Sequence, residues 1–364
     1  MKATAIFTVL FLFASNVLAQ GLRKHGPSPE QIKEMAIHNQ KMARQQALLG
    51  PLVLNSNIKP FYEFDKTGYI LMSDDDFGGM AREMKKVIAQ NLPQDVKLIV
   101  YTQSTNRNYQ NQLRATYSQY VPQDRLIILE VPRSGSSDFW TRDNTPVPIW
   151  ENGRFALVDA KYYYYFEPDA FLNQLFQGTL LTHNYYYEGG NFTTNSRGEC
   201  LVVNRKAGLS DTAAIPDDVF KAKYGCKTLT RFRHLKGIGH SDEVVKFMTD
   251  DIVVTDTAQY VPVLERAGYR VHLLPEAELD FETYVNSLIV NDVLYVPIFG
   301  EQNDQSALQV YRNLNLGYKI VPINSRDLST EGRGSIHCIT MNYPAVPMNV
   351  LTNELKGSVV SFSR

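Results

Sequence analysis

The sequence predicts an α/β protein, because two kinds of segment alternate along its 364 residues. Short apolar runs such as Lys97–Tyr101 and Leu126–Val131 are typical of buried strands. Amphipathic stretches such as Phe77–Gln90 and Gln305–Leu314 are typical of helices. No low-complexity linker separates these segments, so we expect an α/β or α+β arrangement without an obvious domain boundary.

The other expected strands are equally short. They are Tyr69–Met72, Phe155–Val158, Ile252–Val254, Arg270–Leu274, Leu288–Pro297 and Lys319–Ile323. No repeat is visible at the level of residues. Any internal repetition must therefore be structural.

The first 19 residues have the features of an export signal. Lys2 supplies the positive start, Ile6–Ala14 is almost wholly apolar, and Val17-Leu18-Ala19 is a small-residue cleavage site. The apolar run is too short to span a bilayer. We therefore expect residues 1–19 to be a signal peptide and the mature protein to be exported, to the periplasm or the extracellular space.

A helical leader is expected over residues 20–55. Ser28-Pro29-Glu30-Gln31 is a capping box with proline at the first helical position, and Gly50-Pro51 ends the polar helix that follows. Residues 56–364 would then form the main domain.

Composition excludes some classes of partner. The formal net charge is −1, whereas binding to nucleic acid needs a basic surface excess. No segment after the signal is long and apolar enough to span a membrane, so we expect neither nucleic acid nor a membrane as partner of the mature chain.

The chain has three cysteines, Cys200, Cys226 and Cys338. An odd number in an exported protein leaves a free thiol or an intermolecular bridge. A Cys200–Cys226 disulfide with Cys338 free and three free thiols are both compatible with this number.

Four segments place polar or charged residues among glycines, prolines or aromatic residues. They are Phe139–Pro146, Glu188–Asn191, Gly239–Glu243 and Gly332–Thr340. Each is expected at a strand end or in a loop, where a rigid scaffold commonly holds catalytic residues. Taken singly, each has an ordinary structural explanation, such as a turn, a solvated loop or a buried thiol.

Together the four segments indicate a site for a guanidinium group. A guanidinium is a planar cation with N–H donors, which carboxylates such as Asp143 and Asp242 can accept. Burying two carboxylates without a cation would be costly, which favours a substrate site. The thiolate of Cys338 is a nucleophile suited to the resonance-stabilised central carbon, and His240 could donate a proton to departing ammonia and then activate water.

A cysteine protease would use similar residues. It needs one orienting acid and an oxyanion hole instead of two carboxylates directed at a cation, and no cysteine-protease signature is present. A metal site is less well supported, because no C-x-x-C, H-E-x-x-H or EF-hand motif occurs. We expect neither a metal nor a cofactor.

At these residues the chain resembles the bacterial Porphyromonas-type peptidylarginine deiminase and agmatine deiminase family, within the guanidino-group-modifying superfamily. The resemblance covers roughly residues 56–345. Its motifs are WTRD at 140–143, EGGN at 188–191, GHSDE at 239–243, YVNSLIVN at 284–291, VPIFG at 296–300 followed by NDQSAL, and GSIHCIT at 334–340.

The resemblance implies a pentein-type fold, a five-bladed β/α propeller with pseudo-fivefold repeats, for a guanidino-modifying catalytic domain over residues 56–364. It implies that Cys338 forms a covalent amidino-thioether and that His240 is the acid and base. Asp143 and Asp242 would bind the guanidinium, and Asn286 would be a polar residue of the catalytic site.

Two further residues are expected at the substrate. Trp140 would pack against the alkyl chain or the guanidinium face, consistent with cation–π preferences. Glu188 would touch substrate or orient His240, although a role in holding the turn of the two glycines that follow it is an equal alternative.

We expect a hydrolase acting on C–N bonds, which releases ammonia from a guanidino substrate. Peptidyl-arginine conversion to peptidyl-citrulline leads, and agmatine conversion to N-carbamoylputrescine, in putrescine biosynthesis, is the alternative. An amidinotransferase and a non-catalytic guanidine binder are more remote alternatives.

One observation concerns the substrate's carboxylate. No arginine occurs between Phe155 and Ser196, where a clamp for a carboxylate could have stood. Aromatic runs at Tyr162–Phe166 and Tyr185–Tyr187, with Glu167 and Glu188 beside them, instead suggest an aromatic and acidic mouth. Tyrosines that alternate between the two faces of strands are the other explanation.

Overall fold

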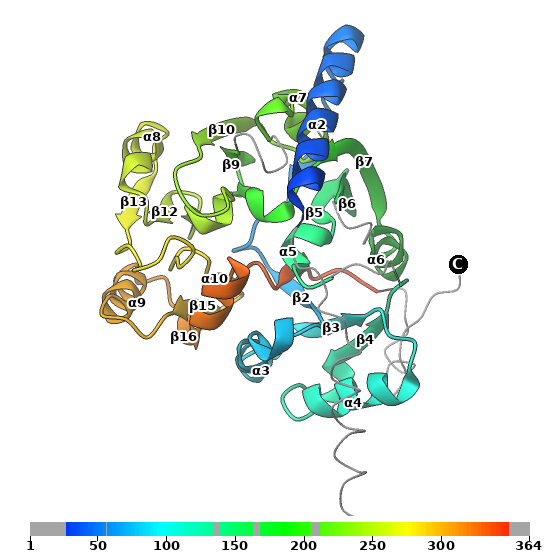
Figure 1. Cartoon of the computed structure of the whole chain (residues 1–364), viewed down its shortest axis with the longest axis vertical. Helices are drawn as coiled ribbons and strands as arrows, with labels where there is room; N and C mark the ends of the chain where they lie inside the picture. The colour runs from blue at the N-terminus through cyan, green and yellow to red at the C-terminus, as the bar shows by residue number, and fades with distance from the viewer. Residues whose placement is uncertain (1–26, 56, 134–137, 163–167, 206–211, 349–364) are drawn as a thin grey trace, which may run out of the picture.

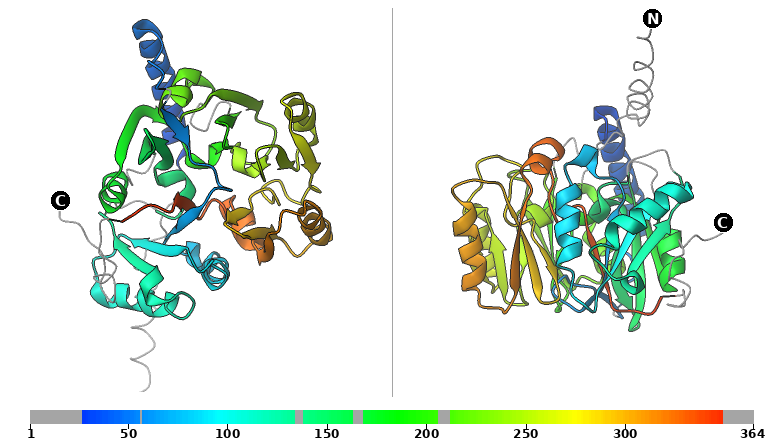
Figure 2. Two further views of the ribbon diagram at one scale, coloured as in Figure 1. Left: turned by 180° about the vertical axis from the view of Figure 1, so that it is seen from behind. Right: turned by 90° about the horizontal axis from the view of Figure 1, so that it is seen from below.

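The computed structural model describes residues 27–55, 57–133, 138–162, 168–205 and 212–348. The predicted signal peptide lies outside these residues. The α/β class is confirmed: the described strands form five separate sheets of three or four strands each. Figure 1 shows the sheets around the middle of the molecule, with most helices at the periphery and the short helices of residues 141–144 and 326–332 nearer the middle, and Figure 2 shows the same arrangement from two other sides.

The first half of the described chain contributes two four-stranded sheets. Their strands are β1 (Ile58–Pro60), β2 (Thr67–Ser73), β3 (Lys97–Thr102), β4 (Leu126–Glu130), β5 (Val147–Glu151), β6 (Arg154–Lys161), β7 (Thr179–Tyr186) and, from the C-terminal part, β17 (Met341–Pro344). The helices along this stretch are α2 (Pro29–Leu49), α3 (Arg82–Gln90), α4 (Arg107–Tyr117), α5 (Thr141–Asn144) and α6 (Asp169–Phe176).

The second half contributes three three-stranded sheets. Their strands are β8 (Thr193–Thr194), β9 (Glu199–Asn204), β10 (Thr228–Arg233), β11 (Lys246–Phe247), β12 (Ile252–Thr255), β13 (Arg270–Leu273), β14 (Leu288–Val290), β15 (Val293–Ile298) and β16 (Lys319–Asn324). The helices are α7 (Asp217–Lys223), α8 (Val261–Arg266), α9 (Asp304–Asn313) and α10 (Arg326–Gly332).

Each of the five sheets contains the same unit. A strand pairs antiparallel with a central strand, and a helix then leads to a third strand that pairs parallel with the central one. The units are β5-β6-α6-β7, β8-β9-α7-β10, β11-β12-α8-β13, β14-β15-α9-β16 and β17-β2-α3-β3. In the last unit β17 pairs with β2, so one sheet joins the two ends of the described main domain.

Most strand predictions are confirmed within one to three residues at each end, and two predictions need correction. Leu288–Pro297 is two antiparallel strands, β14 and β15, because Asn291 adopts a left-handed φ of 53° and turns the chain between them. Helix α3 begins at Arg82 instead of Phe77, because Gly78 and Gly79 have positive φ and separate a short 3₁₀ turn, η1 (Phe77–Gly79), from the helix.

The predicted leader helix is confirmed as α2. Ser28 and Gln31 form the capping box, Pro29 occupies the first turn, and Gly50 follows the last residue. The side chain of Asn39 bonds the backbone of Tyr186 in both directions, at 2.8 and 2.9 Å, so the helix is attached to strand β7. Within the described part of the chain, no helix combines the length and apolar character needed to cross a membrane.

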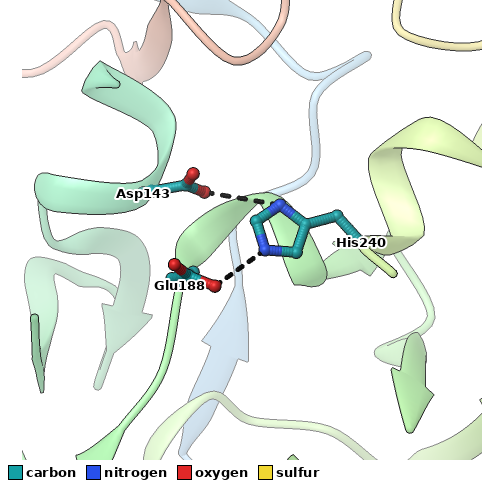
Figure 3. Close-up of side chains that lie close together, drawn as sticks. All are labelled: Asp143, Glu188 and His240. Atoms are coloured by element: carbon teal, nitrogen blue, oxygen red, sulfur yellow. Dashed lines mark hydrogen bonds and ion pairs between the residues drawn. The ribbon is translucent and has the colours of Figure 1, made fainter. Parts of the chain in front are cut away.

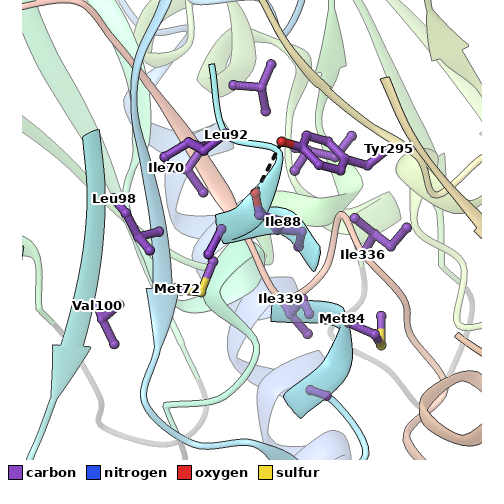
Figure 4. Packing of buried hydrophobic residues seen from close by; sticks show 14 of the residues in the cluster. Ile70, Met72, Met84, Ile88, Leu92, Leu98, Val100, Tyr295, Ile336 and Ile339 are labelled. Carbon is purple, nitrogen blue, oxygen red and sulfur yellow. Dashed lines mark hydrogen bonds between the residues drawn. The ribbon is translucent and has the colours of Figure 1, made fainter. Parts of the chain in front are cut away.

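Two features of the core position the segment around Cys338. Ile336 and Ile339, on either side of it, are fully buried in a hydrophobic cluster with residues of β2, β3 and α3 (Figure 4). Cys200 and Cys226 form a disulfide that joins the start of β9 to the turn before β10, and Cys338 is free. The structure therefore has the first of the two cysteine arrangements compatible with the sequence.

Candidate active site

Cys338 lies in the loop between α10 and β17 and is 2% exposed. Its backbone carbonyl accepts a hydrogen bond of 3.0 Å from the amide of Arg142, which ties this loop to α5. The thiol sulfur lies 3.3 Å from the amide nitrogen of Asn286 and 4.0 Å from a carboxylate oxygen of Asp242. The segment is held on both sides of the sulfur by buried isoleucines, so the thiol has a fixed position.

His240 precedes the 3₁₀ turn η5 (Ser241–Glu243) and is fully buried. Its Nε2 lies 3.0 Å from Glu188 and 3.1 Å from the guanidinium of Arg205, which also pairs with Glu188. Its Nδ1 faces the other way, 3.7 Å from Asp143 and 4.0 Å from Asp242. Figure 3 shows the His240 ring between Asp143 and Glu188. One ring nitrogen is thus oriented by Glu188 and Arg205, and the other is directed toward the aspartates.

The aspartates come from two different segments and face each other across Gly190, which lies in η3 (Gly189–Asn191). Asp143 Oδ1 accepts a 2.9 Å bond from the Gly190 amide. A Cβ added to Gly190 would stand 2.7 Å from His240 Nδ1, 2.8 Å from Asp143 Oδ1 and 3.2 Å from Asp242 Oδ2. The absence of a side chain here therefore leaves space between the three polar groups.

Two polar atoms of the site have no hydrogen-bond partner among the described residues: His240 Nδ1, which borders this space, and Asp242 Oδ1, which lies 4.0 Å from that nitrogen. Buried polar atoms are normally satisfied, so an unsatisfied donor or acceptor at one point indicates a place for a polar ligand. A cation with several N–H donors suits the carboxylates.

The electrostatic environment differs for each group. Burial raises the pKa of Asp143, an effect that the nearby His240 opposes. Burial would also raise the pKa of Asp242, but the hydrogen bond and charge of His337 hold it below its ordinary value. Burial lowers the pKa of His240. Burial raises the pKa of the Cys338 thiol well above its ordinary range, and the charges of Asp242 and Asp143 raise it further.

The structure brings together six of the seven residues predicted for the site: Cys338, His240, Asp143, Asp242, Asn286 and Glu188. Their catalytic roles stay predictions. The seventh, Trp140, is buried with Phe77 and Phe139 in the hydrophobic cluster. A Cβ on Gly334 would lie 2.5 Å from its ring, so Trp140 packs closely on the segment that carries Cys338.

Asp143, Glu188 and His240 offer ligand atoms within 4.8 Å of one another, a spacing that a metal ion could use. The guanidinium of Arg205, however, contacts both Glu188 and His240 Nε2. A permanent cation therefore already occupies one side of this group, and the donors fit acid–base chemistry better than a metal centre.

Sequence reasoning did not select several residues that the structure places around the site. Gly190 lies inside the EGGN motif and His337 lies inside GSIHCIT, directly before Cys338. Their places in these motifs were a usable signal in the sequence. Glu63, Arg205 and Lys246 lie outside the motifs, although Lys246 follows GHSDE closely, and their contacts with the site depend on tertiary structure.

The aromatic mouth is corrected in part. Tyr185 and Tyr187 are buried in the cluster that also holds Tyr224 and the disulfide, so they pack within the protein. Residues 163–167, with most of the other aromatic run and Glu167, lie outside the described residues.

Comparison with known proteins supports the family suggested by the motifs. The profile of the Porphyromonas-type peptidyl-arginine deiminase family matches residues 263–344. Proteins assigned as agmatine deiminases match over shorter stretches: one from Streptococcus mutans is 37% identical over 70 residues, 19% of each chain, and one from Vibrio parahaemolyticus is 40% identical over 63 residues, 17% of each chain. The aligned region thus spans less than a fifth of these relatives.

Solved structures match over most of the chain. An agmatine deiminase from Enterococcus faecalis has a TM-score of 0.64 at 18% identity, covering 79% of this chain and 96% of that one. A Campylobacter jejuni agmatine deiminase with a cysteine-to-serine substitution and substrate bound has a TM-score of 0.63 at 19% identity, with 79% and 97% covered.

A Porphyromonas gingivalis structure assigned as an arginine deiminase has a TM-score of 0.62 at 23% identity, with 79% and 98% covered. These likenesses establish a shared fold, and the family-profile match includes the segment around Cys338. Residues 263–344 thus match the Porphyromonas-type peptidyl-arginine deiminase family, and the chain shares its fold with solved agmatine deiminases, in agreement with the resemblance that the motifs indicate.

Proposed function

We propose that the protein hydrolyses the guanidinium group of its substrate, releasing ammonia and leaving a ureido product. The observation that carries this proposal is the space at Gly190, bordered by two buried aspartates and a buried histidine and lying close to a free thiol. A guanidinium seated there would donate to the aspartates, and its central carbon would be accessible to Cys338.

The geometry supports a two-stage reaction. The Cys338 thiol passes its proton to Nδ1 of His240 as the sulfur attacks the guanidinium carbon and a C–S bond forms, and one C–N bond then breaks as Nδ1 gives that proton to the leaving ammonia. Water then loses a proton to the same nitrogen, attacks the carbon and releases the thiol. Glu188 and Arg205 on Nε2 would hold the ring with Nδ1 directed at the reacting atoms.

Charge explains how the buried thiol would be activated. The aspartates raise the pKa of Cys338 while no cation is present. A bound guanidinium would offset the charges of Asp143 and Asp242, and would thereby favour loss of the thiol proton. The substrate would thus promote formation of the nucleophile that attacks it.

For the substrate we favour a small guanidino compound such as agmatine, because the relatives that match in sequence are assigned as agmatine deiminases. Peptidyl-arginine is the second candidate, favoured by the matching family profile and by the predicted export signal. Export itself, to the periplasm or outside the cell, stays a proposal. So does closure of the five units into a five-bladed propeller.

The test is incubation of the purified protein with agmatine, free arginine and arginine peptides, followed by assay of ureido product and ammonia in equal amounts. Transfer of the amidino group to an added amine, without ammonia release, would instead indicate an amidinotransferase. Absence of any product together with tight guanidine binding would indicate a binding protein.

Cys338→Ser should reduce turnover by at least about a thousandfold, because a serine hydroxyl is a far weaker nucleophile than a thiolate. Mass spectrometry of the wild-type protein, acid-quenched during turnover, should find the amidino adduct on the peptide containing Cys338. The matched control is Cys200→Ser with Cys226→Ser, which removes the disulfide away from the site and should leave kcat within about threefold. A Cys338→Ser variant with a tenth of wild-type activity would contradict covalent catalysis.

A further inference from the structure

His337, immediately before Cys338, lies between two carboxylates. Its Nδ1 is 2.7 Å from Asp242 Oδ2, and its Nε2 is 3.1 Å from Glu63 Oε2. His337 is 4% exposed, so the hydrogen-bond partners of its two ring nitrogens are protein groups and not bulk solvent. Both ring nitrogens therefore face hydrogen-bond acceptors.

A neutral imidazole has one donor and one acceptor nitrogen, so it could donate to only one of the two carboxylates. Its other nitrogen would then place a lone pair against a carboxylate oxygen inside the protein, which is unfavourable. A protonated ring donates to both carboxylates at once. The contacts with Asp242 and Glu63 thus select the charged form of His337.

Glu63 is itself fixed by three elements. Its Oε1 accepts a 2.7 Å bond from the amide of Ile289 in β14, and its Oε2 pairs with the ammonium of Lys246 in β11 as well as with His337. The charges of Lys246 and His337 overcome burial and lower the pKa of Glu63, which stays ionised. Arg142, from α5, donates to the backbone carbonyl of His337 at 3.4 Å and adds a second cation nearby.

The chain of contacts from Lys246 through Glu63 and His337 to Asp242 ends at the proposed substrate space beside Gly190. Because His337 takes Oδ2 of Asp242, this carboxylate is fixed in rotation with its Oδ1 unpaired among the described residues. Oδ1 also lies toward His240 Nδ1, at 4.0 Å. A guanidinium would then meet a carboxylate that is already oriented and ionised, with less conformational freedom to lose on binding.

We propose that His337 is a positioning residue that is held as an imidazolium between Asp242 and Glu63, and that it fixes Asp242 as an ionised acceptor for the cationic substrate. The proposal deepens the function proposed above and rests on it for the part that concerns substrate. The protonation of the ring does not depend on catalysis, so the two can fail separately.

The first experiment is ¹⁵N NMR of the histidine rings in the full-length protein at pH 7.5 to 8.5. Cys338 is the only cysteine in the sequence that directly follows a histidine. Selective labelling of histidine and cysteine therefore identifies the backbone signal of His337 among the seven histidines. We expect both ring nitrogens of His337 to carry protons, because each faces a carboxylate oxygen within hydrogen-bond distance. A neutral His337 ring in this range would overturn the proposal, whether or not the protein deiminates any substrate.

The second experiment measures guanidinium binding and turnover in variants. Glu63→Gln keeps the shape of the side chain and removes its charge, so it should favour the neutral ring and raise KM about ten- to a hundredfold, with a smaller effect on kcat. Its NMR spectrum should show one of the two His337 ring nitrogens without a proton. His337→Gln should weaken binding similarly.

The matched control is Asp256→Asn, which removes another buried carboxylate from an ion pair, Lys236–Asp256 at 2.7 Å, outside this chain of contacts. A loss of stability alone would affect this control and Glu63→Gln alike, whereas the proposal predicts a changed KM only for Glu63→Gln and His337→Gln. Should His337→Gln fail to fold, the wild-type NMR and Glu63→Gln still decide. An unchanged KM in folded Glu63→Gln would contradict the positioning role.

Discussion

At the scale of single residues, the site combines groups that oppose one another until a cation is bound. Asp143 and Asp242 are both buried near His240, and their charges disfavour the Cys338 thiolate. Packing alone would not maintain such a cluster, because like charges in a poorly hydrated environment repel. Under the proposed function, the arrangement becomes favourable when a guanidinium enters, so the same carboxylates would serve binding and activation.

Asp143→Asn and Asp242→Asn should each weaken guanidinium binding and reduce kcat/KM about ten- to a hundredfold or more. Each change replaces an acceptor by an amide that can turn a donor toward the substrate's N–H groups, at a cost of about 1–3 kcal/mol. Calorimetric titration of guanidine compounds into the Cys338→Ser background would measure binding without turnover. Wild-type affinity in either variant would mean that this aspartate is structural.

The same substitutions should have the opposite effect on the free thiol. Negative neighbours raise the pKa of Cys338, so removing one charge should lower that pKa and move thiolate formation to lower pH. Titration of the thiolate absorbance near 240 nm, with Cys338→Ser as the blank, would show this shift. A variant that lost substrate binding while its thiol titrated as in wild type would separate the two roles assigned to the aspartates.

At the scale of elements, the site is assembled from short turns rather than from long helices or strands. Asp143 lies in the four-residue helix α5, Gly190 in η3, and Asp242 in η5, whereas Cys338 is in a loop. Close approach of these turns requires small residues at defined points. A side chain added at Gly189 would contact the backbone of Arg142, whereas one added at Gly190 would contact side chains of the site. Substitutions at these two glycines can therefore be compared.

Gly190→Ala should abolish substrate binding with little effect on the fold, because the added Cβ would enter the space between His240 and the aspartates. We expect kcat/KM to fall at least about a hundredfold and the melting temperature to change by only a few degrees. Gly189→Ala is the contrast: its Cβ would stand 2.3 Å from the backbone carbonyl of Arg142, which cannot move easily, so stability should fall by about 1–3 kcal/mol. Normal activity in Gly190→Ala would show that substrate binds elsewhere.

The sequence was sufficient for what depends on local pattern. The capping box at Ser28 correctly predicted the start of α2, and most strand cores from β2 to β16 that were predicted are present. The hairpin at Asn291 was missed, because its turn is stabilised by tertiary bonds from the Asn291 side chain to the backbone of Thr67 at 2.9 and 3.1 Å. A window of sequence contains no information about that partner.

In the candidate site, too, local sequence motifs predicted some residues, and others are brought in by tertiary contacts. Motifs named the groups that would touch substrate, and the structure brings six of the seven together. The residues behind them, Glu63 and Lys246 above all, have no local signature, because their positions matter only once β11, β14 and the loop of Cys338 are adjacent. Trp140 carried an aromatic signal that fitted substrate binding, while its contacts in the structure are with core residues and glycines.

At the scale of the whole molecule, the main question is which guanidine reaches the buried thiol. Relatives assigned as agmatine deiminases share the fold over most of the chain but align in sequence with under a fifth of it. Among the described arginines near the site, Arg142 donates to the backbone of His337 and to Asn342, and Arg205 is paired with Glu188 and His240. Its charge is therefore already compensated, and it is poorly placed to hold a substrate carboxylate.

The kcat/KM of the reaction should therefore depend little on whether the substrate carries a carboxylate. Amidation of the C-terminal carboxylate of an arginine peptide is expected to lower kcat/KM by less than about tenfold, because a lost bidentate arginine–carboxylate clamp would cost more than that. The comparison should include agmatine, which lacks the carboxylate altogether, and free arginine, which differs from agmatine by that group alone. If agmatine exceeds every peptide, the small-molecule function is supported over peptidyl-arginine. A strong preference for free arginine over agmatine would instead require a carboxylate clamp that the contacts of Arg205 do not provide.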